Sequence, residues 1–287
     1  MKTFGMDKTP SMNKNPSMDG ALAGRLVIIT GSSSGIGYGA ARRLAQTEGV
    51  RVVAVARRRV FRLEALAAQI HEQVGEERLF PLTTDMADRA QAEAVVRQIE
   101  DKFGRVDGFI HAVNRALKLA ALEVSDREFD LTMQVNVKSA LYGVQAVAPS
   151  FKKHGGGGIV IYNPTPRETA DFVASEAVYT AAAHALSALA AGWTRQLAPA
   201  GIGVREVAPV PDSNAAEGAW GRAGLSHDAL LVAALHEALS DPAEPLFLPA
   251  PVKHSLLSFG KPAESHPAEA KPPQILRSRG GLVLKEF

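Results

Sequence analysis

The sequence RLVIITGSSSGIGYGAA, residues 25–41, joins an apolar run, a glycine-rich turn and the start of a helix. Residues 25–30 are apolar and β-branched, as is typical of a buried parallel strand. Gly31, Gly35 and Gly37 interrupt the run, and from Tyr38 the apolar residues return at helical spacing. Helix N-termini attract anions, and glycines let a phosphate approach the backbone. This order of elements favours a dinucleotide site over an ordinary glycine-rich turn.

The length and composition fit one globular domain. A chain of 287 residues, 46% of them hydrophobic, can bury a large core. The net charge of +2 gives no reason to expect nucleic acid or anionic lipid as a partner. No apolar run reaches the roughly 18 residues that span a membrane, and residues 1–20 lack the apolar segment of a secretory signal. The absence of cysteine excludes disulfides, thiolate nucleophiles and cysteine zinc sites, and we expect no metal and a cytoplasmic location.

Strand and helix patterns alternate from residue 25 onward. Strands are predicted at residues 25–30, 50–56, 79–83, 108–113, 159–163, 204–208 and 246–248. Helices are predicted at residues 38–46, 60–74, 87–103, 126–150, 174–197 and 227–239. Repeated βα units indicate a Rossmann-like α/β fold, a doubly wound parallel sheet with helices on both faces of a single domain.

The composition divides the chain into three segments. Residues 1–20 are predicted to form a disordered N-terminal extension, and residues 249–287 a proline-rich C-terminal tail. Between them, residues 21–248 form the predicted domain, in which residues 211–240 would shape a substrate lobe. The last residues, 281–287, turn apolar again and could dock on the domain or on a second subunit.

The segment TGSSSGIG, residues 30–37, matches the TGxxxGIG element in full, and over residues 22–211 the chain resembles the short-chain dehydrogenase/reductase family. The resemblance implies that Thr30 ties the turn together and that Asp85 contacts the adenine amine. It also places Pro209 beside the nicotinamide, although Val210 stands where the family has glycine. The cofactor-binding positions that it implies are Thr30, Gly31, Ser33, Ser34, Gly35, Ile36, Gly37, Arg57, Arg58, Asp85, Met86, Asn114 and Pro209.

The end of the second strand predicts the choice of cofactor. A carboxylate there would accept hydrogen bonds from the adenosine ribose and favour NAD(H), but the position is Ala56. Arg57, Arg58 and Arg59 follow, and a guanidinium pairs well with a 2′-phosphate. NADP(H) is therefore favoured over NAD(H), although Arg57 alone could matter if its two neighbours form a solvated turn.

The catalytic group of the family is only partly present. The resemblance assigns proton transfer to Tyr179, and Asn136 matches the family asparagine in the long helix. The lysine that would lower the tyrosine pKa is replaced by Ala183, and no lysine lies between Lys153 and Lys253. The serine that would bond the carbonyl oxygen is replaced by Pro164, with Thr165 as the nearest hydroxyl.

The fourth strand departs from the family too. His111, Ala112, Val113 and Asn114 stand where the family has Asn-Asn-Ala-Gly. That glycine makes room under the cofactor, whereas Asn114 brings a side chain to the same place.

These losses predict slow chemistry. An unassisted tyrosine has a pKa near 10 and is a poor base at neutral pH. Loss of an acid–base aid costs about 10² to 10⁴ in rate, and loss of an oxyanion donor about 10² to 10³. Arg167, His184 and His111 are candidate replacements for the missing lysine. The simpler interpretation is favoured for each: Arg167 is a solvated loop residue, His184 packs on a helix face and His111 is a hydrogen-bonded core histidine. Lys118 and Lys138 are expected on the surface.

Two functions remain open. The first is a catalytically weak or inactive subunit that binds NADP(H) and partners itself or an active reductase through the alanine-rich helix near residues 181–191. The second is an active NADP(H)-dependent oxidoreductase, or a dehydratase or isomerase, with a rebuilt site that uses Tyr179, Asn136 and Thr165. A scaffold without nucleotide is disfavoured because the glycine-rich turn is complete.

Overall fold

The computed structural model describes residues 22–163, 176–208, 227–243 and 247–248. The chain separates into two compact units, Met1–Ala250 and Pro251–Phe287, and every described residue belongs to the first. The predicted N-terminal extension, the C-terminal tail and residues 211–226 of the substrate lobe lie outside the described residues. The domain boundaries at residues 20 and 248 therefore stay predictions.

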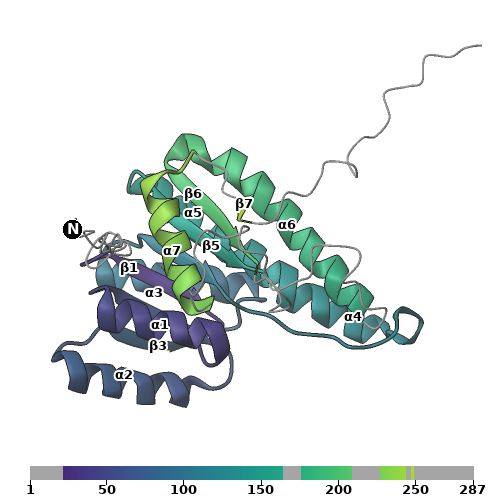
Figure 1. Ribbon diagram of the computed structural model, residues 1–287, viewed down its shortest axis with the longest axis horizontal. Coiled ribbons are helices and arrows are strands. Elements are labelled where there is room, and N and C mark those ends of the chain that lie inside the picture. The colour runs from purple at the N-terminus through teal and green to yellow at the C-terminus, as the bar shows by residue number, and fades with distance from the viewer. Residues whose placement is uncertain (1–21, 164–175, 209–226, 244–246, 249–287) are drawn as a thin grey trace, which may run out of the picture. The chain divides into compact units, whose positions relative to one another are not determined.

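The described strands form one parallel sheet at the centre of the first unit (Figure 1). They are β1 (Leu26–Thr30), β2 (Arg51–Ala56), β3 (Leu79–Thr83), β4 (Gly108–His111), β5 (Gly157–Tyr162), β6 (Ile202–Val207) and β7 (Phe247–Leu248). Their order is β3-β2-β1-β4-β5-β6-β7, and every pairing is parallel. The order reverses between β1 and β4, which is where sheets of this type bind dinucleotides.

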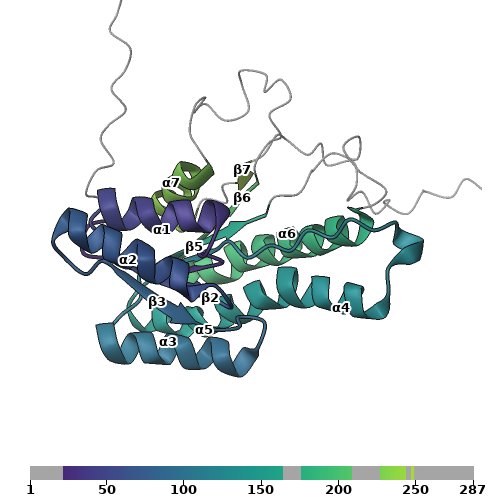
Figure 2. The same cartoon turned by 90° about the horizontal axis from the view of Figure 1, so that it is seen from below.

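Helices cover both faces of the sheet, as Figure 2 shows. One layer holds α1 (Gly35–Thr47), α2 (Val60–Val74) and α7 (His227–Ser240), and the other holds α3 (Arg89–Phe103), α5 (Ser139–Lys153) and α6 (Ala177–Leu197). Alternate residues of β1 serve the two layers, with Val27 and Ile29 in the first core and Leu26 and Ile28 in the second. The predicted Rossmann-like α/β fold is confirmed.

The predicted helix at residues 126–150 is wrong in one respect. It consists of α4 (Asp126–Met133) and α5, joined by the π-helical segment η2 (Gln134–Lys138). A π segment adds one residue to a turn, a change that apolar periodicity does not reveal. The predicted bounds of α2 and β3 are correct, and the other element ends move by three residues or fewer.

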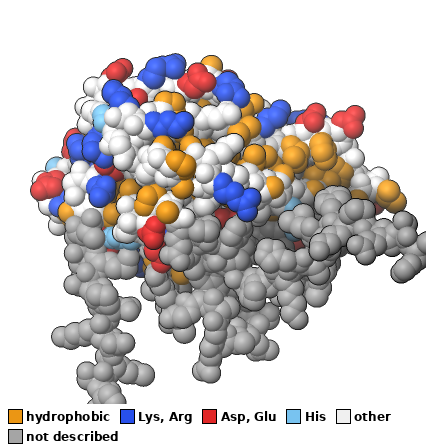
Figure 3. All heavy atoms as spheres, turned by 90° about the horizontal axis from the view of Figure 1, so that it is seen from above, with side chains coloured by type: hydrophobic (Ala, Val, Ile, Leu, Met, Phe, Trp, Pro, Cys, Tyr) orange, Lys and Arg blue, Asp and Glu red, His pale blue; other side chains and the backbone are white. Residues whose placement is uncertain are grey.

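The described surface mixes charged and apolar side chains. Among the described helices, none combines the length and apolar character needed to cross a bilayer. Charged side chains of both signs are scattered over the face in Figure 3, and hydrophobic side chains gather toward the end where α4 and α6 lie in Figure 1. Leu122 and Phe129 are large apolar residues with exposed fractions of 102% and 46%. The cytoplasmic location stays a prediction.

Candidate functional site

The turn between β1 and α1 is built tightly against the sheet. The Ser32 amide and hydroxyl both donate to the Val55 carbonyl of β2, at 3.3 and 3.0 Å. Gly31 has a φ of +72°, and a Cβ added there would lie 2.5 Å from the Ala112 carbonyl oxygen. A Cβ at Gly37 would lie 2.7 Å from the Gly31 carbonyl oxygen. The first and last glycines of the motif are therefore required by backbone contacts.

The helix end beside this turn has the properties of an anion site. The N-cap residue Ser34 makes no side-chain capping bond, and the first turn of α1 has no acidic residue. Gly35 has a φ of +57° and open space on its side-chain side, with no heavy atom within 4 Å of an added Cβ. Uncapped amides and the helix dipole favour an anion there, so the turn fits a pyrophosphate.

The other predicted residues of the turn divide into supporting and exposed positions. Thr30 is fully buried, and Ile36 packs against the first core cluster. Ser33 is half-buried and Ser34 exposed, so these two can face a ligand. Met86 is buried in the second core cluster, and its side chain therefore supports the fold.

Two predicted cofactor residues contact each other at the ends of β2 and β3. Arg57 Nε lies 3.0 Å from Asp85 Oδ2, while Asp85 Oδ1 accepts a hydrogen bond from the Ala87 amide. Arg57 remains half exposed, and Arg58 is exposed. Sequence reasoning missed Arg62, whose Nη1 donates to the Ser33 carbonyl at 3.4 Å. The Arg62 guanidinium therefore lies beside the phosphate turn.

His111 is part of a buried hydrogen-bond chain under the turn. Its Nδ1 lies 2.9 Å from Thr30 Oγ1, and its Nε2 lies 3.3 Å from Ser139 Oγ. Ser139 donates its own hydrogen to the Val135 carbonyl, so the imidazole donates from Nε2 and accepts at Nδ1. Burial lowers the pKa of His111 to about 3. These contacts agree with the core role expected for this histidine.

This low pKa predicts a pH dependence of stability. Between pH 6.5 and about 3 the unfolded chain binds a proton at His111 and the folded chain does not, so acidification destabilises the fold. From pH 7 to pH 5 this single group should remove about 2 kcal/mol from the free energy of unfolding. Urea unfolding of wild type and His111→Asn at both pH values measures the effect. Equal pH dependence in the two proteins would contradict the assignment.

Asn136 lies in the π segment and fixes the loop after β4. Its side-chain Oδ1 accepts from the Arg115 amide at 2.7 Å, and its Nδ2 donates to the Arg115 carbonyl at 2.9 Å. The Arg115 guanidinium in turn bonds Thr132 Oγ1 and the Glu128 carboxylate of α4. Asn136 is therefore a positioning residue, since it holds the residue that follows Asn114.

Tyr179 lies in the first turn of α6, is 7% exposed and contacts Asn114. Asn114 Nδ2 donates a hydrogen bond to the Tyr179 phenolic oxygen, with a distance of 3.0 Å. Burial, followed by the charge of ionised Tyr179, raises the pKa of Tyr162 to about 12. Tyr162 therefore stays neutral at physiological pH. Of these two tyrosines, Tyr179 is the one that accepts a hydrogen bond from the loop after β4.

The predicted lysine position belongs to a different polar cluster. Ala183 is buried, and its carbonyl accepts from Asn163 Nδ2 at 2.9 Å. The same Nδ2 lies 3.0 Å from Ser187 Oγ and 2.7 Å from Glu206 Oε1, and Ser187 also donates to Glu206. Glu206 is 4% exposed. The Asn163 side chain therefore links a buried carboxyl group to the carbonyl of Ala183, the residue that replaces the lysine.

The remaining candidates are not brought to Tyr179 by the described contacts. His184 is exposed and donates from Nδ1 to the Thr180 carbonyl within α6. Lys118 is exposed and lies 3.6 Å from the Glu176 carboxylate, and Lys138 is exposed. Pro164, Thr165, Arg167 and Pro209 lie outside the described residues.

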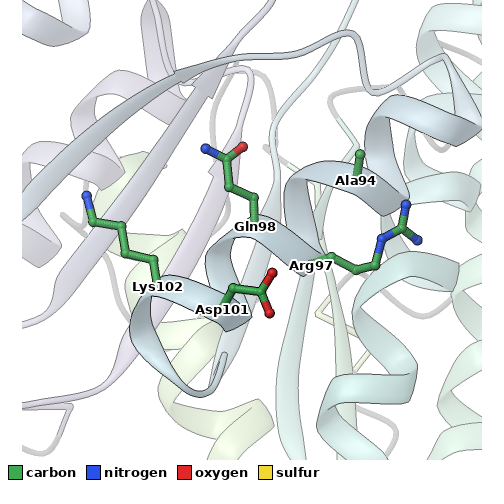
Figure 4. A pocket seen from close by; sticks show the side chains of 5 residues that line it. All are labelled: Ala94, Arg97, Gln98, Asp101 and Lys102. Atoms are coloured by element: carbon green, nitrogen blue, oxygen red, sulfur yellow. The ribbon is translucent and has the colours of Figure 1, made fainter.

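An open hollow on α3 is unrelated to this site. It has a volume of about 590 Å³ and is lined by Ala94, Arg97, Gln98, Asp101 and Lys102, all from one helix (Figure 4). These residues occupy the later part of α3, which runs back toward the amino ends of the strands. The phosphate turn lies at the carboxyl ends, so the hollow is at the opposite edge of the sheet.

Comparisons with known proteins agree with this geometry. The family model for short chain dehydrogenase matches residues 25–217. An uncharacterised oxidoreductase of Staphylococcus haemolyticus is 32% identical over 190 residues, which is 66% of this chain and 78% of that protein.

Two solved structures show the same fold. A metagenomic short-chain oxidoreductase in complex with NADP has a TM-score of 0.66 at 23% identity, covering 78% of this chain and 95% of the other. L-sorbose reductase from Gluconobacter frateurii, complexed with NADPH and L-sorbose, has a TM-score of 0.62 at 26% identity, covering 67% and 71%.

Proposed function

Because the chain belongs to the short-chain dehydrogenase family, a family of oxidoreductases that bind nicotinamide dinucleotides, we propose that it binds NADP(H) but transfers hydride weakly or not at all. It would act as a subunit that pairs with itself or with an active reductase. The observation that carries this proposal is Ala183, which stands at the lysine position, has a buried side chain and gives its carbonyl to Asn163.

The phosphate turn supports the nucleotide part of the proposal. Its open helix end fits a pyrophosphate, and Arg57 and Arg58 are exposed beyond β2. A guanidinium pairs favourably with a 2′-phosphate, which supports NADP(H) over NAD(H). In this proposal the chain supplies the cradle that would hold the nucleotide, whereas hydride transfer stays weak or absent.

The polar groups around α6 support weak proton transfer. A nearby cation would favour the phenolate of Tyr179. At the former lysine position, the described contacts of Ala183 are instead with the Asn163 amide, which also donates to the Glu206 carboxyl group. Tyr179 can still donate a proton, but no described contact replaces the lysine by an ammonium group.

One contact favours the alternative of an active enzyme with a rebuilt site. A hydrogen bond donated to the charged form of an acid favours ionisation, and Asn114 donates to the Tyr179 oxygen. In that case Tyr179 would serve as the acid or base for a carbonyl or hydroxyl substrate, in reduction, dehydration or isomerisation. Asn136 would contribute by holding the β4 loop.

Association through α6 is part of the proposal. Ala181 and Ala188 are exposed along this helix, and small side chains permit close helix contact. The exposed Phe129 of α4, and Leu122 shortly before it in the chain, add apolar surface. Light scattering of the purified chain tests self-association, and co-purification from its own cells tests a paralogous partner.

Two measurements test the function itself. NADPH at about 100 times its Kd should stabilise the fold by roughly 2.7 kcal/mol in thermal unfolding, and absence of a shift with NADPH and NADH would refute nucleotide binding. Steady-state turnover of NADPH with a panel of aldehydes and ketones should stay near background. Robust turnover that is lost in Tyr179→Phe would establish the active alternative.

The choice of cofactor yields a separate prediction. Arg57→Ala should weaken NADPH binding by about 10- to 100-fold, the value of a charge-assisted hydrogen bond, and leave NADH binding nearly unchanged. Arg58→Ala is the matched control, because it removes an equal charge from the next residue. Calorimetric titration measures both ligands. An equal loss for NADH, or a larger loss in Arg58→Ala, would contradict the role of Arg57.

A further inference from the structure

The loop after β4 is joined to α6 across the carboxyl edge of the sheet. Asn114 Nδ2 donates to the Tyr179 oxygen at 3.0 Å, between residues 65 positions apart in the chain. Asn114 is exposed, whereas Tyr179 is 7% exposed. The hydrogen bond therefore joins an exposed side chain of the loop to a buried phenol of the helix.

Both ends of this bridge are positioned by other contacts. Asn136 bonds the amide and the carbonyl of Arg115, the residue next to Asn114. The Arg115 side chain is tied to Thr132 and Glu128 of α4. Tyr179 belongs to α6, which packs on β6 and η2. The bridge is therefore built by ordered elements on both sides.

The Asn114–Tyr179 bridge lies at the carboxyl ends of the strands, where a dinucleotide would bind. A dinucleotide lies across the carboxyl ends at the point where the strand order reverses, with its pyrophosphate at the first helix N-terminus. A dinucleotide bound in this way would place one half toward β2 and β3, where Arg57 and Asp85 meet. Its other half would face β4 and β5, where Asn114 reaches Tyr179.

We propose that the Asn114–Tyr179 bridge closes the β4–β5 half of this crevice, so that the chain recognises the 2′-phosphorylated adenosine half of the nucleotide and gains little from the nicotinamide half. The inference rests on the proposed nucleotide binding and adds to it which half of the ligand is recognised. The ligand class is an adenosine nucleotide with a 2′-phosphate. The nicotinamide riboside can enter only when the bridge opens.

Calorimetry with two probes tests the proposal. Adenosine 2′,5′-bisphosphate and NADPH are titrated into the full chain, and we expect their Kd values to agree within about threefold, because the second half adds few contacts. Asn114→Gly should lower the Kd of NADPH by about tenfold, because one competing hydrogen bond is removed. The Kd of the bisphosphate should not change. Tyr179→Phe removes the same bond from the other side and should shift NADPH in the same direction.

Ala116→Gly is the matched control, because it adds a glycine to the same exposed loop without touching the bridge. It should change neither Kd. NADPH that binds wild type more than about tenfold tighter than the bisphosphate, with no change in Asn114→Gly, would overturn the proposal but leave the proposed function standing. Failure of both probes to bind wild type and Asn114→Gly would refute the proposed function as well.

Discussion

The variant Gly203→Ala is expected to lose about 3 kcal/mol or more of its unfolding free energy, because a well-packed contact has no room for the added methyl group. A Cβ at Gly203 would lie 2.0 Å from the Ala238 carbonyl oxygen and 2.8 Å from the Ala238 carbonyl carbon. Both atoms belong to the backbone of α7. Since neither can rotate away, the helix itself must move off β6.

Movement of α7 would disturb groups beyond the point of contact. The buried Arg205 guanidinium donates to the Asp241 and Glu237 carbonyls at 2.6 and 3.4 Å, at the C-terminal end of this helix. At the other end, Asp228 accepts from Arg43 of α1 at 3.1 Å. Because α1 begins at the phosphate turn, the substitution should weaken nucleotide binding along with the fold.

Gly192→Ala is the matched control for Gly203→Ala. Gly192 lies inside α6, and an added Cβ there meets no heavy atom within 4 Å. Alanine in an open helix interior should gain roughly 0.5 to 1 kcal/mol. Thermal unfolding followed by circular dichroism should lower the Tm of Gly203→Ala by about 10 °C and leave that of Gly192→Ala equal or higher. A Tm near wild type for Gly203→Ala would contradict the packing argument.

The fold was predictable because its signals are local. The apolar run at residues 25–30, the glycines after it and the alternation of strand and helix each lie within a short window. The phosphate turn was predictable for the same reason, since its strand, turn and helix are contiguous. The π segment at Gln134–Lys138 was missed because one extra residue in a helical turn hardly changes the apolar spacing.

The contacts of the site were less accessible to sequence reasoning. Asn114 was expected to crowd the cofactor, but its bond to Tyr179 depends on how two distant segments meet. The pairing of Arg57 with Asp85 was not foreseen, although both were named as cofactor residues. Glu206 was missed because residues 202–207 were read only as a buried strand, although Arg205 and Glu206 interrupt its apolar residues. A carboxyl group inside a strand expected to be buried was the signal that could have identified this cluster.

The cluster of Asn163, Ser187 and Glu206 carries the second large expected effect. Asn163→Leu should cost about 1.5 to 3 kcal/mol, because it removes one hydrogen-bond donor from a carboxyl group that stays buried. Glu206 Oε1 accepts from Asn163 at 2.7 Å and from Ser187 at 2.6 Å, and the carboxylate is 4% exposed. Leucine has the same branched arrangement of four side-chain heavy atoms as asparagine, so the cost measures lost hydrogen bonding more than lost packing.

The double variant Asn163→Leu/Glu206→Met separates the two causes. When both partners become apolar, the buried carboxyl group that has lost a donor is removed as well, and most of the lost stability should return. Ser187 can then donate to the Ala183 carbonyl one turn earlier in α6, which Asn163 no longer occupies. Urea unfolding of wild type, both single variants and the double variant gives the coupling energy. If the losses of stability in the double variant are additive, the cluster stabilises α6 by packing alone. If the double variant recovers stability, Asn163 is needed because it donates to the buried carboxyl group of Glu206.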